Sequence, residues 1–538
     1  MDGLPFELID RISSFLALDD LKRTLLVSPA FQVAAEHHSG AFANFTFDNV
    51  DIDGELFLKT YSGRRLGYLR YIEVHTHLSS LQPYDVDPDD LPCRESRAEL
   101  SRKDKAFTEQ IQHVFEIIRK AETDARLSQH GPGKVQLTIL TPIRWVDPSF
   151  CRHRLSSAWR VHFLHPETLP QLESVRVLSI CNPEQFTGRD GCRCAMSRLD
   201  LRVLIDMASR LPNLEYLGCC LGTEEWRLPD ADPARKHFEH DFEGCARDSR
   251  NDFATALDEA QLSLSLRDVQ LDFFNDLRTH LQVEEGGGLD LVSPATQDFF
   301  SSSLRVLGKG LRRLDLRVKA DASLFWPDQG SASFPNLESL SVMFHPMTPS
   351  GSWYFCGANG KGASDVGYQV TDAMYPPLES NNPQDANWHF EETLDAVKAP
   401  VYFRGVPNEG TLNPFLEAFA KAASTMHALR VFTLWSPLAN GLGWGISYAR
   451  PGERATFYSP DDDFSLSRQL WWRVGNWRPE SELHKLFQGI GRLKYDKEVV
   501  EHWNEESGGS ALSNQEVFTE SKAALTVSGS TYPGWRLA

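Results

Sequence analysis

The segment LPNLEYLGCC, residues 211–220, and its counterpart FPNLESLSVM, residues 334–343, show the pattern that decides the fold. Each contains the turn-forming pair Pro-Asn and then apolar residues in the order apolar-x-x-apolar-x-apolar. The last residues of each segment alternate with a period of two, which is typical of a strand with one buried face. Both segments are therefore predicted to be a turn followed by a short strand.

The same spacing recurs along the chain, in segments that begin at Leu69, Leu172, Leu214, Leu311, Leu337 and Leu429. Looser versions occupy residues 135–139 and 264–271. Apolar stripes with helical spacing precede four of these segments, around Phe107, Leu201, Phe299 and Phe415. A helix followed by a strand, repeated, resembles irregular leucine-rich repeats. That resemblance implies a solenoid with one curved sheet of parallel strands and helices on its outer face.

The unequal spacing of the segments predicts degenerate units with insertions, and a doubly wound α/β domain is the structural alternative. The α/β region is expected to span residues 43–435, with an insertion at 343–412. Within that insertion, residues 352–370 suggest a projecting hairpin, and its aromatic side chains are expected to pack on the repeats rather than to bind a partner. A Trp-rich cap is expected at 436–505 and a disordered tail at 506–538.

Charge and cysteine content narrow the class of protein. The chain has 538 residues, a formal net charge of −19 and 41% hydrophobic residues, which is ordinary globular composition. Acidic chains repel phosphate backbones, so a nucleic-acid partner is not expected. The nine scattered cysteines favour a reducing compartment, either cytoplasm or nucleus. No basic leader and no apolar run long enough to cross a bilayer is visible, so no membrane partner is expected.

The first forty residues predict three short helices. Pro5 suits a first helical turn, and Leu8, Ile12, Phe15 and Leu16 follow at helical spacing. A second helix is expected to begin at residues 19–20, whose carboxylates favour a helix N-terminus, and a third after the N-cap residue Ser28. So short a segment cannot bury all of its apolar side chains by itself. Some of them are expected to meet a partner or the rest of the chain.

This pattern resembles the F-box motif of fungal-type F-box proteins over residues 1–42. The resemblance implies docking on a Skp-family adaptor, which links the chain indirectly to a cullin complex. The residues that match the family pattern, or stand where it places an aromatic anchor, are Leu4, Pro5, Leu8, Ile12, Leu16, Leu21, Leu25, Val27, Ser28 and Phe31. They are expected to divide between the adaptor interface and the small helical core. Many F-boxes have Trp near the position of Phe31.

The implied function is that of a substrate-recognition subunit of a ubiquitin ligase, with an unidentified protein as target. One alternative is an interaction protein that holds the adaptor without a cullin, and another is an enzyme with its site in the insertion or the Trp-rich end. No catalytic residue, cofactor or metal site is predicted. The pair Cys192 and Cys194 lacks paired C-x-x-C spacing, and His237, His240 and Asp241 are explained more simply by a solvated helix face.

Overall fold

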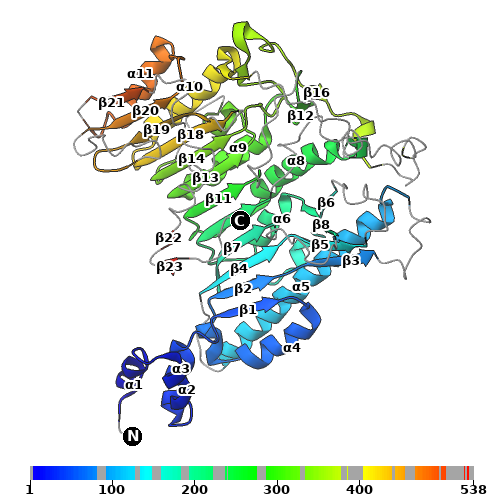
Figure 1. Cartoon of the computed structure of the whole chain (residues 1–538), viewed down its shortest axis with the longest axis vertical. Coiled ribbons are helices and arrows are strands. Elements are labelled where there is room, and N and C mark those ends of the chain that lie inside the picture. The colour runs from blue at the N-terminus through cyan, green and yellow to red at the C-terminus, as the bar shows by residue number, and fades with distance from the viewer. Residues whose placement is uncertain are drawn as a thin grey trace.

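The computed structural model describes residues 4–81, 92–127, 134–147, 159–182, 193–221, 237–238, 240–274, 286–327, 334–376, 385, 404–438, 443–454, 467–495, 498–503, 526–527 and 530–531. These residues form a mixed α/β structure with ten α-helices and one large, mostly parallel sheet (Figure 1). None of the described helices combines the length and the apolarity needed to cross a bilayer.

The large sheet has twelve strands, and their order in space is their order in the sequence. They are β1 (Asn44–Phe47), β2 (Tyr71–Val74), β4 (Val135–Leu140), β7 (Val175–Cys181), β10 (Tyr216–Cys220), β11 (Asp268–Asp272), β13 (Arg313–Val318), β14 (Ser339–Phe344), β18 (Val431–Pro437), β19 (Gly443–Ala449), β20 (Gln469–Arg473) and β21 (Val500–Trp503). Neighbours are parallel from β1 to β18. The ladders β18–β19 and β19–β20 are antiparallel, and β20–β21 is parallel again.

All eight segments predicted to be strands form strands of this sheet, namely β2, β4, β7, β10, β11, β13, β14 and β18. A doubly wound sheet reverses its strand order at a switch point. The described strands of this sheet follow the chain without such a reversal, so the doubly wound alternative is wrong. The Trp-rich segment after residue 435 continues the sheet through β19, β20 and β21.

One face of the sheet packs against the helices. The apolar positions of successive strands are in register, so they form rows such as Ile72, Leu137, Leu178, Leu217, Val269, Leu314, Leu340, Phe432, Tyr448 and Leu470. These rows and the helices share one continuous core. The helices are α4 (Val50–Tyr61), α5 (Arg97–Leu127), α6 (Arg202–Ala208), α8 (Glu243–Glu259), α9 (Phe299–Leu307), α10 (Glu409–Thr425) and α11 (Ser481–Gly489).

The other face of the sheet carries the alternate positions of the strands, and these are mostly polar. They include Gln136, Thr138, Ser179, Gln270, Asp315, Arg317, Thr433 and Ser447. Their charges are locally neutralised: the Arg317 guanidinium donates to the Asp272 carboxylate at 2.6 Å, and that of Arg313 to Asp315 at 3.0 Å. Each of the eight side chains just named is less than one tenth exposed. The period-two pattern of the sequence therefore separates an apolar, helix-covered face from a polar one.

Three more helices form a separate unit at one end of the sheet. They are α1 (Phe6–Ser13), α2 (Leu18–Thr24) and α3 (Pro29–His38), drawn in dark blue in Figure 1. Both α1 and α2 pack on α3. The unit, residues 4–38, lies beyond the β1 edge and away from the helices that cover the sheet (Figure 1). We call it the three-helix unit.

Short ladders and 3-10 turns complete the described structure. The ladders join β3 (His77–Leu81), β5 (Ile143–Val146) and β8 (Arg193–Met196); β6 (Arg160–Val161) and β9 (Arg198–Leu199); β12 (Leu289–Asp290) and β16 (Tyr368–Gln369); β15 (Phe355–Cys356) and β17 (Val406–Pro407); and β22 (Thr526–Val527) and β23 (Ser530–Thr531). The 3-10 turns are η1 (Arg64–Tyr68), η4 (Pro166–Thr168), η6 (Gly308–Gly310), η7 (Ala322–Leu324), η8 (Ala358–Gly360) and η9 (Asp372–Met374).

The hairpin predicted within residues 352–370 is wrong. Strand β15 pairs antiparallel with β17, and β16 pairs parallel with β12, so both strands take partners distant in the sequence. Three aromatic side chains of the segment pack inward as expected, since Trp353, Tyr354 and Phe355 are at most 3% exposed, but Tyr368 is 44% exposed. Most of residues 506–538 and the residue Cys192 lie outside the described residues.

Candidate functional site

A small core holds the three-helix unit together. Ile9 of α1, Leu21 of α2, and Phe31 and Ala34 of α3 are each at most 7% exposed. The Ser28 hydroxyl caps α3 by accepting from the Phe31 backbone N–H at 3.3 Å, and Pro29 follows as the first helical residue. The cap and helix start predicted at Ser28 are thus present, whereas α1 begins one residue after Pro5 and α2 begins at Leu18.

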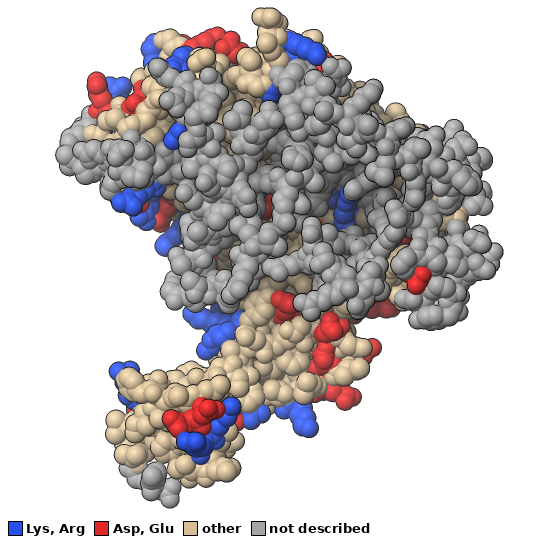
Figure 2. Space-filling model, in the orientation of Figure 1, with Lys and Arg blue, Asp and Glu red and all other residues tan. Residues whose placement is uncertain are grey.

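The apolar stripe that begins in α1 and ends at Phe15, just after the helix, points away from this core. Ile9 and Ser13 face inward, whereas Leu8, Ile12 and Phe15 are 51, 43 and 72% exposed. The end of α2 and the turn after it present more apolar surface, with Leu26 at 95% exposure. Figure 2 shows the unit as a largely uncharged lobe, with a small group of acidic and basic side chains on its front and a basic side chain at its edge.

Exposed apolar side chains are concentrated in this unit. Of the 21 exposed large hydrophobic residues in the described structure, nine lie between residues 4 and 27: Leu4, Phe6, Leu8, Ile12, Phe15, Leu18, Leu25, Leu26 and Val27. Single exposed apolar residues are ordinary, but a dense group of them marks an interaction surface. We call these nine residues the apolar face of the unit.

The ten residues singled out from the sequence divide between surface and core. Leu4, Pro5, Leu8, Ile12, Leu25 and Val27 are exposed, Leu16 and Ser28 are half-buried, and Leu21 and Phe31 are buried. Four members of the apolar face were not singled out: Phe6, Phe15, Leu18 and Leu26. Their exposure depends on how the helices pack, which the pattern of one helix does not determine.

A buried acidic residue fixes the unit to the 3-10 turn η1, which precedes β2. The Glu36 carboxylate at the end of α3 is 4% exposed and accepts hydrogen bonds from Arg64 at 2.9 Å and from Arg65 at 2.6 Å. Burial opposes its ionisation, but the bonds to Arg65 and Arg64 outweigh burial and lower the pKa of Glu36. The ring of His37 also stacks on Tyr68 at 5.3 Å. These contacts set the orientation of the apolar face relative to the sheet.

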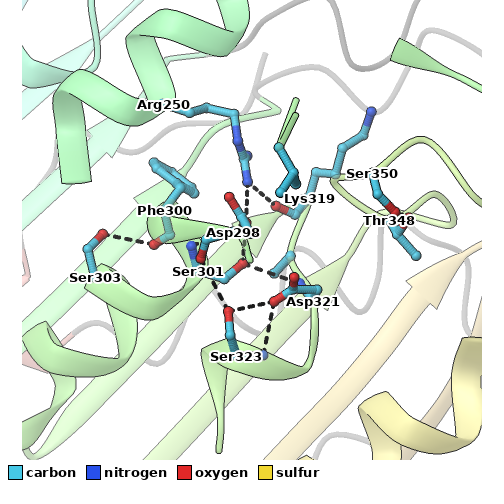
Figure 3. A network of polar contacts seen from close by, with 12 residues as sticks. Arg250, Asp298, Phe300, Ser301, Ser303, Lys319, Asp321, Ser323, Thr348 and Ser350 are labelled. Atoms are coloured by element: carbon cyan, nitrogen blue, oxygen red, sulfur yellow. Dashed lines mark hydrogen bonds and ion pairs between the residues drawn. The ribbon is translucent and has the colours of Figure 1, made fainter. Parts of the chain in front are cut away.

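A second polar cluster lies inside the sheet–helix body (Figure 3). The Arg250 guanidinium of α8 donates to the Asp298 carboxylate at 2.7 Å, and Asp298 also accepts from the Ser301 hydroxyl at 2.6 Å. Burial raises the pKa of nearby Asp321, whose carboxylate accepts from the Ser323 hydroxyl. Ser301 is fully buried, and its hydroxyl also accepts from the backbone N–H of Asp321 at 3.2 Å. The cluster caps α9 and joins it to α8, which is a structural role.

The residues considered for a metal near position 240 do not converge. His237 contacts Asp385 at 3.0 Å, His240 contacts Glu243 at 3.4 Å, and Asp241 pairs with Arg94. The Arg94 cation stands between His237 and Asp241, and an arginine in that place disfavours a metal cation. The solvated-face interpretation is also wrong for His237 and Asp241, whose side chains are only 21 and 16% exposed.

Three other groups of His and Asp side chains bring possible ligand atoms together among the described residues. They are Asp10 with His37 and His38, Asp48 with His75 and His77, and His162 with Asp200 and Asp252. None was predicted from the sequence. The second group contains the spacing His-x-His, which places two rings on the same side of an extended segment. This spacing is the feature of the sequence from which the group could have been predicted.

Comparison of the chain with protein-family models and with curated proteins finds no match. The chain's own geometry must therefore support any statement about its function. Its most distinctive feature is the apolar face that the three-helix unit leaves exposed.

Proposed function

We propose that the chain is an F-box adaptor of a Skp–cullin ubiquitin ligase and has no catalytic role of its own. The observation that carries the proposal is the apolar face of residues 4–27, which is attached to the body yet left uncovered by it. A three-helix unit with this much exposed apolar surface lowers its free energy by docking on a protein. The spacing of residues in α1, α2 and the start of α3 matches the F-box pattern, which makes a Skp-family adaptor the fitting partner.

The body, in this proposal, is an irregular leucine-rich-repeat-like solenoid that receives a protein target. Support comes from eight helix- or turn-led parallel strands laid down in chain order, with the leading leucines of the six regular segments all at most 5% exposed. Solenoids serve as extended recognition scaffolds. The contribution to catalysis is proximity, because holding a target lysine near an activated thioester converts a bimolecular step into an effectively unimolecular one.

The test is native mass spectrometry of complexes purified with the full-length chain from cells. The proposal expects the adaptor and a cullin with the wild-type chain, and neither with Leu8→Ala/Ile12→Ala. Adaptor without cullin would replace the ligase function with that of an adaptor-bound interaction protein. Equal recovery of the adaptor by the wild-type and double-variant chains would overturn the assignment of the interface.

A further inference from the structure

Two histidines and an aspartate meet at the carboxyl ends of β1 and β2. Asp48 directly follows β1, His75 directly follows β2, and His77 begins β3. One oxygen of Asp48, Oδ1, lies 3.0 Å from His75 Nδ1 and 3.5 Å from His77 Nε2. All three ligand atoms lie within 4.8 Å of one another. Two atoms that bind one Zn²⁺ tetrahedrally at ~2.0–2.1 Å are ~3.3 Å apart, so the observed separations suit a shared ion.

The backbone of each of these residues is held in place. The Asp53 carboxylate accepts from the backbone N–H groups of Asp48 and Asn49, both at 2.8 Å. The backbone N–H of His75 donates to the carbonyl of Phe47 at 2.8 Å, which ties the two strand ends together. The side-chain amide of Gln110 on α5 accepts from the His77 N–H at 3.0 Å and donates to its carbonyl at 2.8 Å. The site is therefore organised without an ion.

A further carboxylate orients the His75 ring. Glu73 Oε1 lies 2.7 Å from His75 Nε2, and the other oxygen of Glu73 accepts from the Tyr71 hydroxyl at 2.5 Å. A ligating histidine in proteins almost always donates its second ring N–H to a carboxylate, carbonyl or water. Nδ1 of His75 then faces Asp48 at 3.0 Å, and an ion bound by both groups would replace that hydrogen bond. The chain Tyr71–Glu73–His75 is thus the outer support of a metal site.

We propose that Asp48, His75 and His77 bind a Zn²⁺ ion. Two imidazoles and one carboxylate favour a borderline transition metal over Ca²⁺ or Mg²⁺, which prefer oxygen ligands alone. Three protein ligands leave one tetrahedral position for water. Side-chain exposures of 72% for Asp48 and 36% for His77 give the ion access from solvent. The site is independent of the adaptor interface, because its ligands come from the strand ends of the sheet.

The other two groups are weaker candidates. His37 and His38 are neighbours on one helix, and they lie 3.5 and 2.8 Å from Asp10 Oδ1, which is an arrangement similar to that at Asp48. The group around His162 offers a single imidazole. Neither combines two imidazoles from an extended His-x-His with a carboxylate that orients a ring, as the group at Asp48 does.

The experiment measures Zn²⁺ binding to the full-length chain after chelator treatment, by competition with a chromophoric chelator. We expect one tight equivalent for wild type and a weakening of ~100-fold or more for Asp48→Asn/His77→Ala. Glu73→Gln keeps all three ligands and is expected to weaken binding by ~10–100-fold through the orientation of His75. Circular dichroism and thermal unfolding verify that each variant folds.

Two controls separate this site from other histidines and from the cysteines. His37→Ala/His38→Ala and the surface variant His165→Ala are expected to bind Zn²⁺ like wild type. Co²⁺ in place of Zn²⁺ is expected to give the visible absorption of a tetrahedral site without a thiolate charge-transfer band. Equal affinity of wild type and Asp48→Asn/His77→Ala, loss of the tight equivalent in His37→Ala/His38→Ala, or a thiolate band would overturn the proposal.

Discussion

Replacing Leu8 and Ile12 together with alanine is expected to separate adaptor binding from folding. Both side chains point away from the core of the three-helix unit and are 51 and 43% exposed. They contribute little to the packing of α1 on α3, since Ile9 and Ser13 occupy the inward positions. The unfolding free energy of the double variant should therefore stay within about 0.5 kcal/mol of wild type, as for most surface substitutions.

The loss of binding follows from the surface that docking would remove from water. Complete burial of a Leu or Ile side chain contributes about 1.5–3 kcal/mol, so the exposed half of each contributes roughly 1 kcal/mol. A gap left at the interface adds to this, as at truncated hot spots. The expected total is about 2–4 kcal/mol, which is a weakening of roughly 30- to 1000-fold.

Isothermal titration of the full-length chain with a purified Skp-family adaptor measures this difference. Two matched control variants show whether weaker adaptor binding comes from the lost contacts or from lost folding. Leu264→Ala removes an apolar side chain that is 93% exposed but lies outside the unit, so binding should not change. Ile9→Ala removes a buried one and should destabilise the unit by about 2–5 kcal/mol. An affinity of the double variant within threefold of wild type would refute the reasoning.

Three further predictions concern the internal contacts. Glu36→Gln should destabilise the attachment of the three-helix unit by about 1–3 kcal/mol at pH 7. Because the pKa of Glu36 is lowered in the folded chain, this loss of stability should shrink as the pH falls below the pKa of Glu36 in the unfolded chain. Chemical unfolding at several pH values measures the change. Asp298→Ala leaves the Arg250 cation buried and unpaired and should cost about 3–5 kcal/mol in chemical unfolding, whereas Asp19→Ala should cost almost nothing. Burial, only partly offset by an arginine partner, raises the pKa of Asp206 to about 6. The unfolding free energy of wild type, relative to that of Asp206→Asn, should therefore fall as the pH rises from about 4 to 6. A difference between the two proteins that stays constant across that range would contradict the raised pKa.

Local patterns in the sequence predicted much of the body. The eight strands and the helices α5, α6, α9 and α10 each carry their own periodicity, and the order of strands follows because helix-led units pack on their neighbours. Helix α8 was missed because its buried face is short and interrupted by charge: Arg250 lies inside it. The ladders β12–β16 and β15–β17 were missed because each joins strands far apart in the chain, and short strands carry no signal for a distant partner.

The two proposed binding sites show the same division. The helices and the Ser28 cap of the three-helix unit follow from local sequence, but which side of α1 faces outward does not, because the stripe of Leu8, Ile12 and Phe15 has the appearance of a core face. Likewise the sequence alone shows His75 and His77 as a pair. Asp48 lies far from them in the sequence and is brought beside them only by the pairing of β1 with β2.

Hydrogen–deuterium exchange of the full-length chain, with and without a purified Skp-family adaptor, tests the central claim most directly. Docking of the apolar face predicts slower exchange at backbone amides of α1, α2 and the turn before α3, with the sheet unchanged. Slower exchange confined to the sheet, or no change in these helices at an adaptor concentration that saturates a known F-box protein, would contradict it.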